Sequence, residues 1–173
     1  AVGVPGVAAE VSCQDADGDG YYIGCENYET IDGPDADDSD PNVWTIDGAA
    51  NCVDADGDGY YSGCDAYVTV DGPDADDSDP NNWTAEGVTN CIDGDGDGYY
   101  SGCDAYITLN GPDADDADRN NWTPSGVANC TDADGDGYYS GCDAYVTVDG
   151  PDADDTDPNN WTPSGVADCT DAD

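Results

Sequence analysis

The chain has 173 residues and a formal net charge of −41, because 42 acidic residues face a single basic residue, Arg119. This charge excludes nucleic acid as a partner, since proteins that bind phosphate backbones do so with basic groups. Two carboxylates about 4 Å apart repel by about 4 kcal/mol at an effective dielectric constant near 20. We therefore expect the chain to be largely unfolded unless cations neutralise it.

One 39-residue unit, the distance from Cys13 to Cys52, recurs four times without insertion or deletion. Such a period predicts modules that contact mainly their neighbours. We expect a mostly irregular fold with small β elements and little or no helix, in which Asp-rich calcium-loop repeats stack as an elongated array. The predicted boundaries are 13–51, 52–90, 91–129 and 130–168, with 1–12 as the tail of a preceding partial repeat or a processed N-terminus and 169–173 as the start of a truncated fifth repeat.

Each repeat opens with a cysteine, and a second cysteine follows twelve positions later. The absence of His and the wide Cys spacing give little support to a zinc or iron–sulfur site, so we expect disulfides and an oxidising, extracellular or cell-surface location. Closure within a repeat would contribute roughly 3 kcal/mol, but pairing between successive repeats, such as Cys25 with Cys52, stays open. The eight cysteines are Cys13, Cys25, Cys52, Cys64, Cys91, Cys103, Cys130 and Cys142, with Cys169 left over.

An acidic loop lies between the two cysteines, with alternate aspartates followed by glycine and tyrosine. The spacing matches positions 1, 3 and 5 of a calcium loop, with the tyrosine carbonyl at position 7 and an acid at position 12. Four matches in phase predict a calcium site in every repeat. The expected side-chain ligands are Asp15, Asp17, Asp19 and Glu26; Asp54, Asp56, Asp58 and Asp65; Asp93, Asp95, Asp97 and Asp104; and Asp132, Asp134, Asp136 and Asp143, with backbone ligands Tyr21, Tyr60, Tyr99 and Tyr138.

The segment after the loop is rich in β-branched and aromatic residues and ends at an Asp-Gly-Pro turn signal. In the second repeat it covers 65–70, and we predict a short strand there. Because no helices flank the loops, a sensor that opens on binding calcium is not expected.

A second acidic string follows the turn. It either forms a second site or completes the first from the other side, because calcium requires six or more oxygen ligands. We expect at least one Ca²⁺ per repeat and favour two or more. The residues are Asp35, Asp37, Asp38 and Asp40; Asp74, Asp76, Asp77 and Asp79; Asp113, Asp115, Asp116 and Asp118; and Asp152, Asp154, Asp155 and Asp157.

Each repeat also carries a Trp, preceded by Asn in all but the first, where Asn-Val precedes Trp44. Asn-Trp-Thr is an acceptor sequence for N-linked sugar, with candidates at Asn82, Asn121 and Asn160. The alternative is that the Asn pair caps a turn and positions the Trp. We expect the Trp rings to pack between repeats, because units this polar cannot build independent cores; sugar-binding platforms or electron-hopping stations are the other options.

The string Asp-x-Asp-Gly-Asp-Gly-Tyr, followed by Asp-Ala-Asp-Asp-Ser-Asp-Pro-Asn, resembles the MopE-type metal-binding repeats of secreted bacterial proteins and, more distantly, thrombospondin type 3 repeats. The resemblance implies calcium wrapped by irregular, disulfide-linked backbone in an extracellular protein. Where that family's second string has Cys, this chain has Ala36, Ala75, Ala114 and Ala153, so the family's disulfide pattern does not transfer. A copper role is also unsupported, because soft His and Met ligands are missing.

Catalysis has no support in a chain without His or Lys, where Ser has no group to activate it. No apolar stretch is long enough to span a membrane. We expect a structural extracellular fibre or surface appendage, formed by self-association or by continuation of the same array. The alternative is a calcium-dependent stalk or adhesin module that presents or binds a ligand such as glycan.

Overall fold

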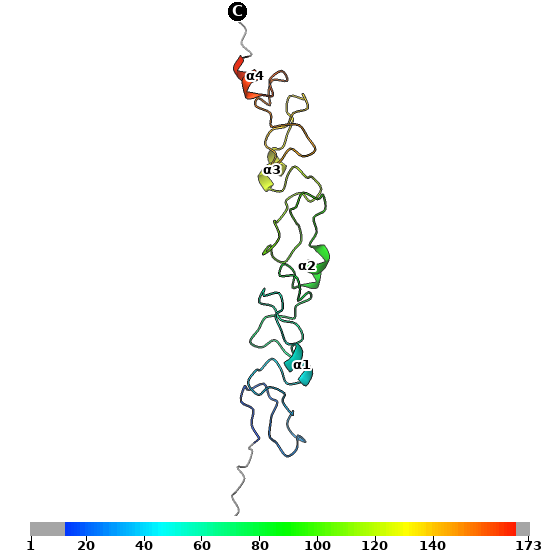
Figure 1. The fold of residues 1–173 in the computed structure, drawn as a ribbon, viewed down its shortest axis with the longest axis vertical. Helices are drawn as coiled ribbons and strands as arrows, with labels where there is room; N and C mark the ends of the chain where they lie inside the picture. Colours follow the sequence, from blue (N-terminus) through cyan, green and yellow to red (C-terminus); the bar gives the residue numbers. More distant parts are fainter. Residues whose placement is uncertain (1–12, 169–173) are drawn as a thin grey trace, which may run out of the picture. The chain divides into compact units, whose positions relative to one another are not determined.

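The computed structural model describes residues 13–168. The chain divides into two compact units, one ending at Thr84 and the other beginning at Ala85. The predictions for 1–12 and 169–173, including Cys169, lie outside the described residues. The helices are α1 (Ile46–Asn51), α2 (Ala85–Asn90), α3 (Pro124–Asn129) and α4 (Pro163–Asp168), one at the end of each repeat (Figure 1).

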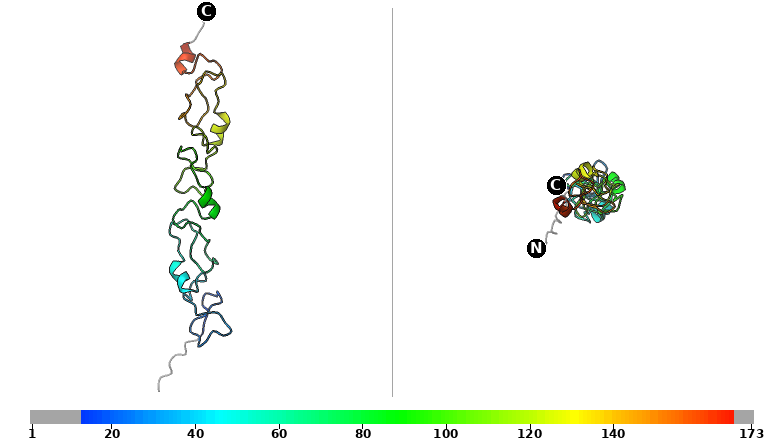
Figure 2. Two further views of the ribbon diagram at one scale, coloured as in Figure 1. Left: turned by 90° about the vertical axis from the view of Figure 1, so that its right-hand side faces the viewer. Right: turned by 90° about the horizontal axis from the view of Figure 1, so that it is seen from above.

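Irregular backbone makes up the rest of each unit, as the further views in Figure 2 show. Instead of a sheet, isolated bridges hold each acidic loop. In the second repeat Val53 pairs with Ser62 in antiparallel fashion, and Tyr60 pairs with Asp71 in parallel. The expectation of an irregular fold with little helix is confirmed.

The disulfides close within repeats, which resolves the two pairings that the sequence left open. Each joins the ends of one acidic loop across a sequence separation of 12. Cross-links of this loop size remove roughly 3 kcal/mol of chain entropy from the unfolded state. The bonds are Cys13–Cys25, Cys52–Cys64, Cys91–Cys103 and Cys130–Cys142.

The predicted strand at 65–70 is wrong, because this segment forms bends. Its backbone donors face an asparagine side chain of the preceding repeat instead of a neighbouring strand. The amides of Val68 and Thr69 donate to Asn42 Oδ1 at 2.8 and 3.0 Å. Residues with high β propensity form a strand only where a partner strand supplies the ladder.

The helices, by contrast, have a signal in the sequence. Thr45 caps α1, accepting a hydrogen bond from Gly48 N at 2.9 Å, and Thr123 caps α3 in the same way. Pro124 occupies the first turn of α3, where its missing N–H costs nothing. Each short helix therefore begins directly after the Thr of the Trp-Thr pair.

The described part of the chain holds almost no apolar core. Val43 is its single buried hydrophobic residue, whereas the fully buried side chains of largest volume are Asn42 and Asn81. Aromatic pairs supply the remaining packing: Tyr21 stacks on Trp44 with ring centroids 4.6 Å apart. The same pair recurs as Tyr60–Trp83, Tyr99–Trp122 and Tyr138–Trp161. Each Trp thus stacks on a Tyr of its own repeat, which differs from the expected packing between repeats.

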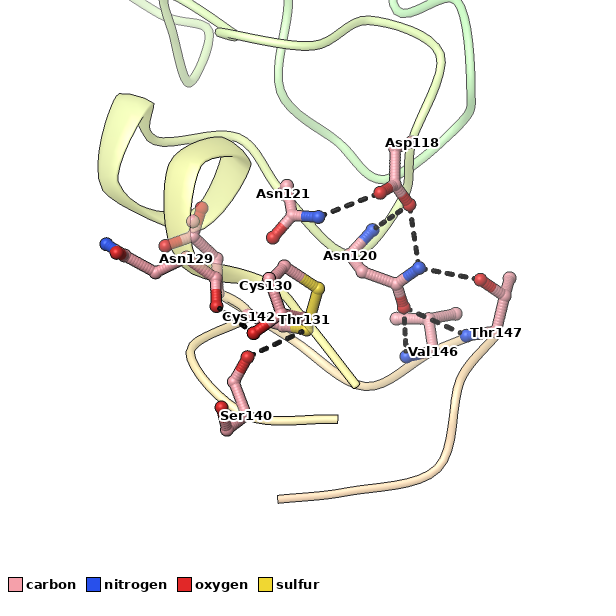
Figure 3. The surroundings of a disulfide bond; sticks show 12 residues. Asp118, Asn120, Asn121, Asn129, Cys130, Thr131, Ser140, Cys142, Val146 and Thr147 are labelled. Atoms are coloured by element: carbon pink, nitrogen blue, oxygen red, sulfur yellow. Dashed lines mark hydrogen bonds between the residues drawn. A yellow bond between two sulfur atoms is a disulfide. The ribbon is translucent and has the colours of Figure 1, made fainter. Parts of the chain in front are cut away.

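Successive repeats within a unit are joined by a buried asparagine. Asn42 is 1% exposed, and its Nδ2 donates to Asp40 Oδ1 at 2.6 Å and to Thr69 Oγ1 of the next repeat at 2.7 Å. Its backbone carbonyl accepts from Ala66 N at 3.0 Å. In the second unit Asn120 makes the same contacts with Val146 and Thr147, drawn in Figure 3.

A carboxylate completes this joint from the other side. Asp65 accepts hydrogen bonds from Trp44 N, Thr45 N and Thr45 Oγ1 at 2.6 to 2.7 Å. It lies so close to α1 that a Cβ added at Gly48 would overlap Asp65 Oδ2. We call the donating half (Asn42, Trp44, Thr45, Gly48 and their equivalents) the plug, and the receiving half (65–69 and equivalents) the socket.

Candidate metal centre

An aspartate triad occupies the tip of every acidic loop. Each triad offers three carboxylate oxygens that lie within 4.8 Å of one another, and each residue is half-buried. The four triads are Asp15, Asp17 and Asp19; Asp54, Asp56 and Asp58; Asp93, Asp95 and Asp97; and Asp132, Asp134 and Asp136. The predicted first, third and fifth loop positions are therefore brought together in all four repeats.

The loop backbone is held by hydrogen bonds to these side chains, and in the second repeat Asp54 uses both oxygens, since its Oδ2 accepts from Gly59 N at 3.2 Å. In the second repeat, Asp54 Oδ1 accepts from Gly57 N at 2.7 Å, and Asp56 Oδ1 accepts from Asp58 N at 3.1 Å. Asp58 Oδ1 in turn accepts from Tyr60 N at 2.7 Å. These side-chain turns fix the curvature of the loop and explain why short-armed Asp is used instead of Glu.

Two glycines permit this curvature. Gly57 and Gly59 have φ angles of 84° and 100°, in the left-handed region that residues with a Cβ rarely adopt. A Cβ at either position would meet nothing within 4 Å, so conformation and not space requires glycine there.

The second oxygen of the third and fifth loop residues is buried and lacks a hydrogen-bond partner. The same holds for the first Asp of the second acidic string. A buried unpaired carboxylate oxygen is strongly unfavourable, so a recurrent set indicates a missing positive partner. The atoms are Oδ2 of Asp17, Asp19 and Asp35; of Asp56, Asp58 and Asp74; of Asp95, Asp97 and Asp113; and of Asp134, Asp136 and Asp152.

The second acidic string thus completes the first loop. Asp35 is 8% exposed, and its pKa is raised above 3.8 by burial and by the charges of Asp19 and Asp17. Asp74 shows the same shift, caused by burial together with Asp58 and Asp56. Of the two roles that the sequence left open for this string, the position of its first residue beside the triad favours the completing one.

Backbone carbonyls at the seventh loop position are also available. Among the described residues, the carbonyl oxygens of Tyr21, Tyr60, Tyr99 and Tyr138 accept no hydrogen bond. Their amide groups are fixed by the preceding aspartate, as in Tyr21 N to Asp19 Oδ1 at 2.7 Å.

The acids expected at the twelfth position lie away from the triads. Both carboxylate oxygens of Asp65 accept hydrogen bonds from Thr45 of the preceding repeat, and those of Asp143 accept from Thr123. Although burial opposes it, these hydrogen bonds hold the pKa of Asp65 below 3.8. Asp104 lies against Gly87 in the corresponding place, and Glu26 is exposed. Asp65, Asp104 and Asp143 therefore belong to the joint between repeats, and loop position alone did not reveal this because their partners are about 20 residues upstream.

The remaining acids of the second string hold backbone turns and neighbouring loops. The third residue of the string binds the acidic loop of its own repeat. Asp77 accepts hydrogen bonds from Ala55 N and Ser62 Oγ, both at 2.7 Å. Asp38, Asp116 and Asp155 make the same backbone contact in the other repeats. The second residue of the string accepts a hydrogen bond from the Ser or Thr hydroxyl two positions later where the repeat has one, as Asp76 does from Ser78. The residues at this position are Asp37, Asp76, Asp115 and Asp154.

The fourth residue binds the asparagine pair. Asp79 accepts from Asn81 Nδ2 and Asn82 Nδ2, both at 2.7 Å. Burial opposes ionisation, but these amides outweigh it and lower the pKa of Asp79; Asp118 behaves likewise. With Asp40 and Asp157 in the same position, this set organises the plug.

The asparagines of the sugar-acceptor sequences are largely inaccessible. Asn82 and Asn121 are 3% exposed and Asn160 is 6% exposed, and the Nδ2 of each donates to an aspartate. Glycosylation stays a prediction, which this burial disfavours in the folded chain. The alternative interpretation of the Asn pair, as a turn cap beside the Trp, agrees with these contacts.

The donor set fits a hard divalent cation. Four carboxylates and one carbonyl per repeat supply oxygen ligands alone, which suits Ca²⁺, whose six to eight ligands commonly include water. The described loops contain no thiolate or imidazole that is free to bind a softer metal. The described helices include none long and apolar enough to cross a bilayer.

Comparison of the chain with protein-family models, with curated proteins and with solved structures finds no match in any of the three. The resemblance to MopE-type repeats stays a prediction.

Proposed function

We propose that this chain is a structural segment of an extracellular fibre or surface appendage, in which bound Ca²⁺ replaces the apolar core. The observation that carries this proposal is the recurrence of buried, unpartnered carboxylate oxygens at the same three positions in all four repeats. Each Asp triad with its fourth carboxylate would hold one ion, and the ion would cancel the repulsion that otherwise opens the loop.

A structural role follows from identical sites in series. The four disulfides indicate an oxidising environment, which supports an extracellular location. The geometry favours one ion per repeat over two, because the acids outside the triad group are engaged with amides and hydroxyls.

The test is metal content combined with electron microscopy. We expect four Ca²⁺ per chain after dialysis against micromolar calcium, and extended particles that lose their form in chelator. Zinc, copper or no bound metal would overturn the proposal.

The alternative, a stalk or adhesin module that binds glycan, has one observation in its favour. A cavity of about 570 Å³ beside the Tyr21–Trp44 stack is lined by both rings and Pro34. Aromatic faces of this kind can support a sugar ring. Calcium-dependent retention on a glycan array, without extended particles, would favour this alternative.

A further inference from the structure

The third repeat differs from the others at the position of the single basic residue in the chain. Arg119 stands where the first, second and fourth repeats have Pro41, Pro80 and Pro158. The third repeat carries eight aspartates and this arginine, a net charge of −7, whereas the second carries nine aspartates and one glutamate, a net charge of −10. The charge around the acidic loop is therefore not the same in every repeat.

The guanidinium of Arg119 lies against the acidic loop of its own repeat. Its Nη2 donates to the backbone carbonyl of Gly96 at 2.6 Å, and Gly96 stands between Asp95 and Asp97 of the triad. A Cβ added at Gly96 would meet only this guanidinium, with Nη2 at 3.4 Å, whereas one at the equivalent Gly57 would meet nothing within 4 Å. A positive charge therefore stands at the edge of the proposed ion site of the third repeat.

The guanidinium does not take the place of the ion. In the third repeat the Oδ2 atoms of Asp95, Asp97 and Asp113 are buried without a hydrogen-bond partner, as the equivalent atoms of the second repeat are. The carboxylates that would bind the ion are thus the same in both repeats. The difference between the two sites is a cation held just outside the donor set.

Two effects of Arg119 on calcium binding oppose each other. Its hydrogen bond to Gly96 O helps to hold the loop closed, which favours binding. Both residues are exposed, however, so this bond replaces one with water and contributes little. The guanidinium stays charged across the accessible pH range, and its repulsion acts on an ion of charge +2. Because charge count is a main determinant of calcium affinity, we expect the repulsion to outweigh the hydrogen bond.

We propose that Arg119 lowers the calcium affinity of the third repeat, so that this repeat releases its ion before the second repeat does as the calcium concentration falls. The inference rests on the proposed function and deepens it by naming how two of its sites differ. Arg119 acts through its charge and does not contact the ion. Loss of the ion at one defined repeat would open one acidic loop while the loop of the second repeat stays closed.

The Tyr–Trp stacks give each repeat its own reporter. Trp122 stacks on Tyr99 with ring centroids 4.5 Å apart, and Tyr99 N donates to Asp97 of the triad. Trp83 stacks on Tyr60 in the second repeat in the same way. Replacing three of the four tryptophans with phenylalanine leaves one Trp in the full chain and an aromatic ring in each stack. Calcium titrations of the Trp83 chain and the Trp122 chain, followed by fluorescence, then give a midpoint for each of the two sites.

Exchanging residues between the two repeats tests the role of Arg119 in both directions. At low ionic strength we expect the Trp122 midpoint at about tenfold higher free calcium than the Trp83 midpoint. Arg119→Pro should move the Trp122 midpoint toward that of Trp83, and Arg119→Lys, which keeps the charge, should leave it in place. Pro80→Arg should raise the Trp83 midpoint about tenfold, whereas the uncharged control Pro80→Gln should not.

Added salt separates an effect of charge from an effect of structure. Raising the ionic strength from 0.1 to 1 M shortens the Debye length from about 10 Å to about 3 Å. We expect the difference in Trp122 midpoint between the Arg119 chain and the Arg119→Pro chain to shrink over this range, because screening weakens repulsion and leaves a purely structural effect in place.

Equal midpoints for Trp83 and Trp122, or an Arg119→Pro chain whose Trp122 midpoint stays or rises, would overturn this inference and leave the calcium scaffold standing. An equal rise in the Trp83 midpoint with Pro80→Gln and with Pro80→Arg would overturn it too, since the loss of proline would then be responsible. If neither Trp responds and the chain binds no calcium, the proposed function itself is contradicted.

Discussion

At the scale of single residues, the aspartates at the third and fifth positions of each loop divide their two oxygens between the backbone and the centre of the loop. Asp56 Oδ1 holds Asp58 N, while Asp56 Oδ2 is buried without a partner. Asp74 repeats this arrangement from the second acidic string, with its Oδ1 on Asp76 N. In the proposed site this division marks the carboxylates that keep an unpartnered oxygen for an ion, whereas Asp54 gives both of its oxygens to backbone amides.

The substitution Asp74→Asn tests the completing carboxylate. Because charge count tunes calcium affinity over decades, we expect the second repeat to bind Ca²⁺ about tenfold more weakly or not at all. Isothermal titration calorimetry against a competing chelator measures this. Asp71→Asn is the matched control in the same repeat, since the third repeat carries Asn110 at that position. Equal weakening by both substitutions would show that overall charge matters and the proposed site does not.

The metal-free chain should be most stable near pH 4. The pKa values of Asp17 and Asp35 are raised by burial and by neighbouring acids, so stability is lost as pH rises from 3.8 through the raised values. The pKa values of Asp79 and Asp118 are lowered, and the stability they contribute is lost as pH falls below 3.8.

Far-UV circular dichroism and sedimentation of the calcium-depleted chain between pH 2 and 8 measure this optimum. Compactness that rises steadily from pH 4 to pH 8 without metal would contradict the assignment of buried, mutually repelling carboxylates.

The aspartate triads were predictable from spacing, but the carboxylates of the joint between repeats were not. Alternate Asp with Gly and Tyr identified the triads because these contacts are local in sequence. The fourth carboxylate, Asp35, and the destination of Asp65 depend on contacts about 20 residues away, so the sequence left the first open and misplaced the second.

At the scale of elements, each short helix serves the joint between repeats. Its N-terminus carries the Thr cap, and the first turn receives a carboxylate from the next repeat, as α1 receives Asp65. In the sequence, Thr-Pro or Thr-Ala is only a weak signal for the start of a six-residue helix, because the glycine inside each segment disfavours helix formation. That glycine is required by the close approach of the carboxylate.

The substitution Gly48→Ala tests the role of this glycine. A methyl group there would displace Asp65, so we expect a loss of about 1–3 kcal/mol in the free energy of unfolding. Gly165→Ala, at the equivalent position of α4, should change stability by no more than about 1 kcal/mol. Urea unfolding in saturating calcium, at concentrations where the chain is monomeric, compares the two. Similar losses for both would contradict the described joint.

At the scale of the whole molecule, polar contacts and, in the proposed function, bound ions take the place of an apolar interior. Buried hydrophobic residues are scarce in residues 13–168, where four disulfides, four Tyr–Trp stacks and buried asparagines stabilise a chain with a net charge of −41. The repulsion between carboxylates in each loop, about 4 kcal/mol for each close pair, opposes these contributions. The irregular fold was predictable from this composition, whereas the bends that replace the expected strand depend on Asn42 and its equivalents.

Near-UV circular dichroism during chelation tests the central claim most directly. The Tyr–Trp stacks give a signal that reports their fixed geometry, and Tyr60 belongs to both the loop and its stack. We predict that EGTA abolishes this signal at pH 7 while the disulfides remain intact, and that Ca²⁺ restores it. A near-UV spectrum and a melting temperature that are unchanged by complete calcium removal would contradict the account.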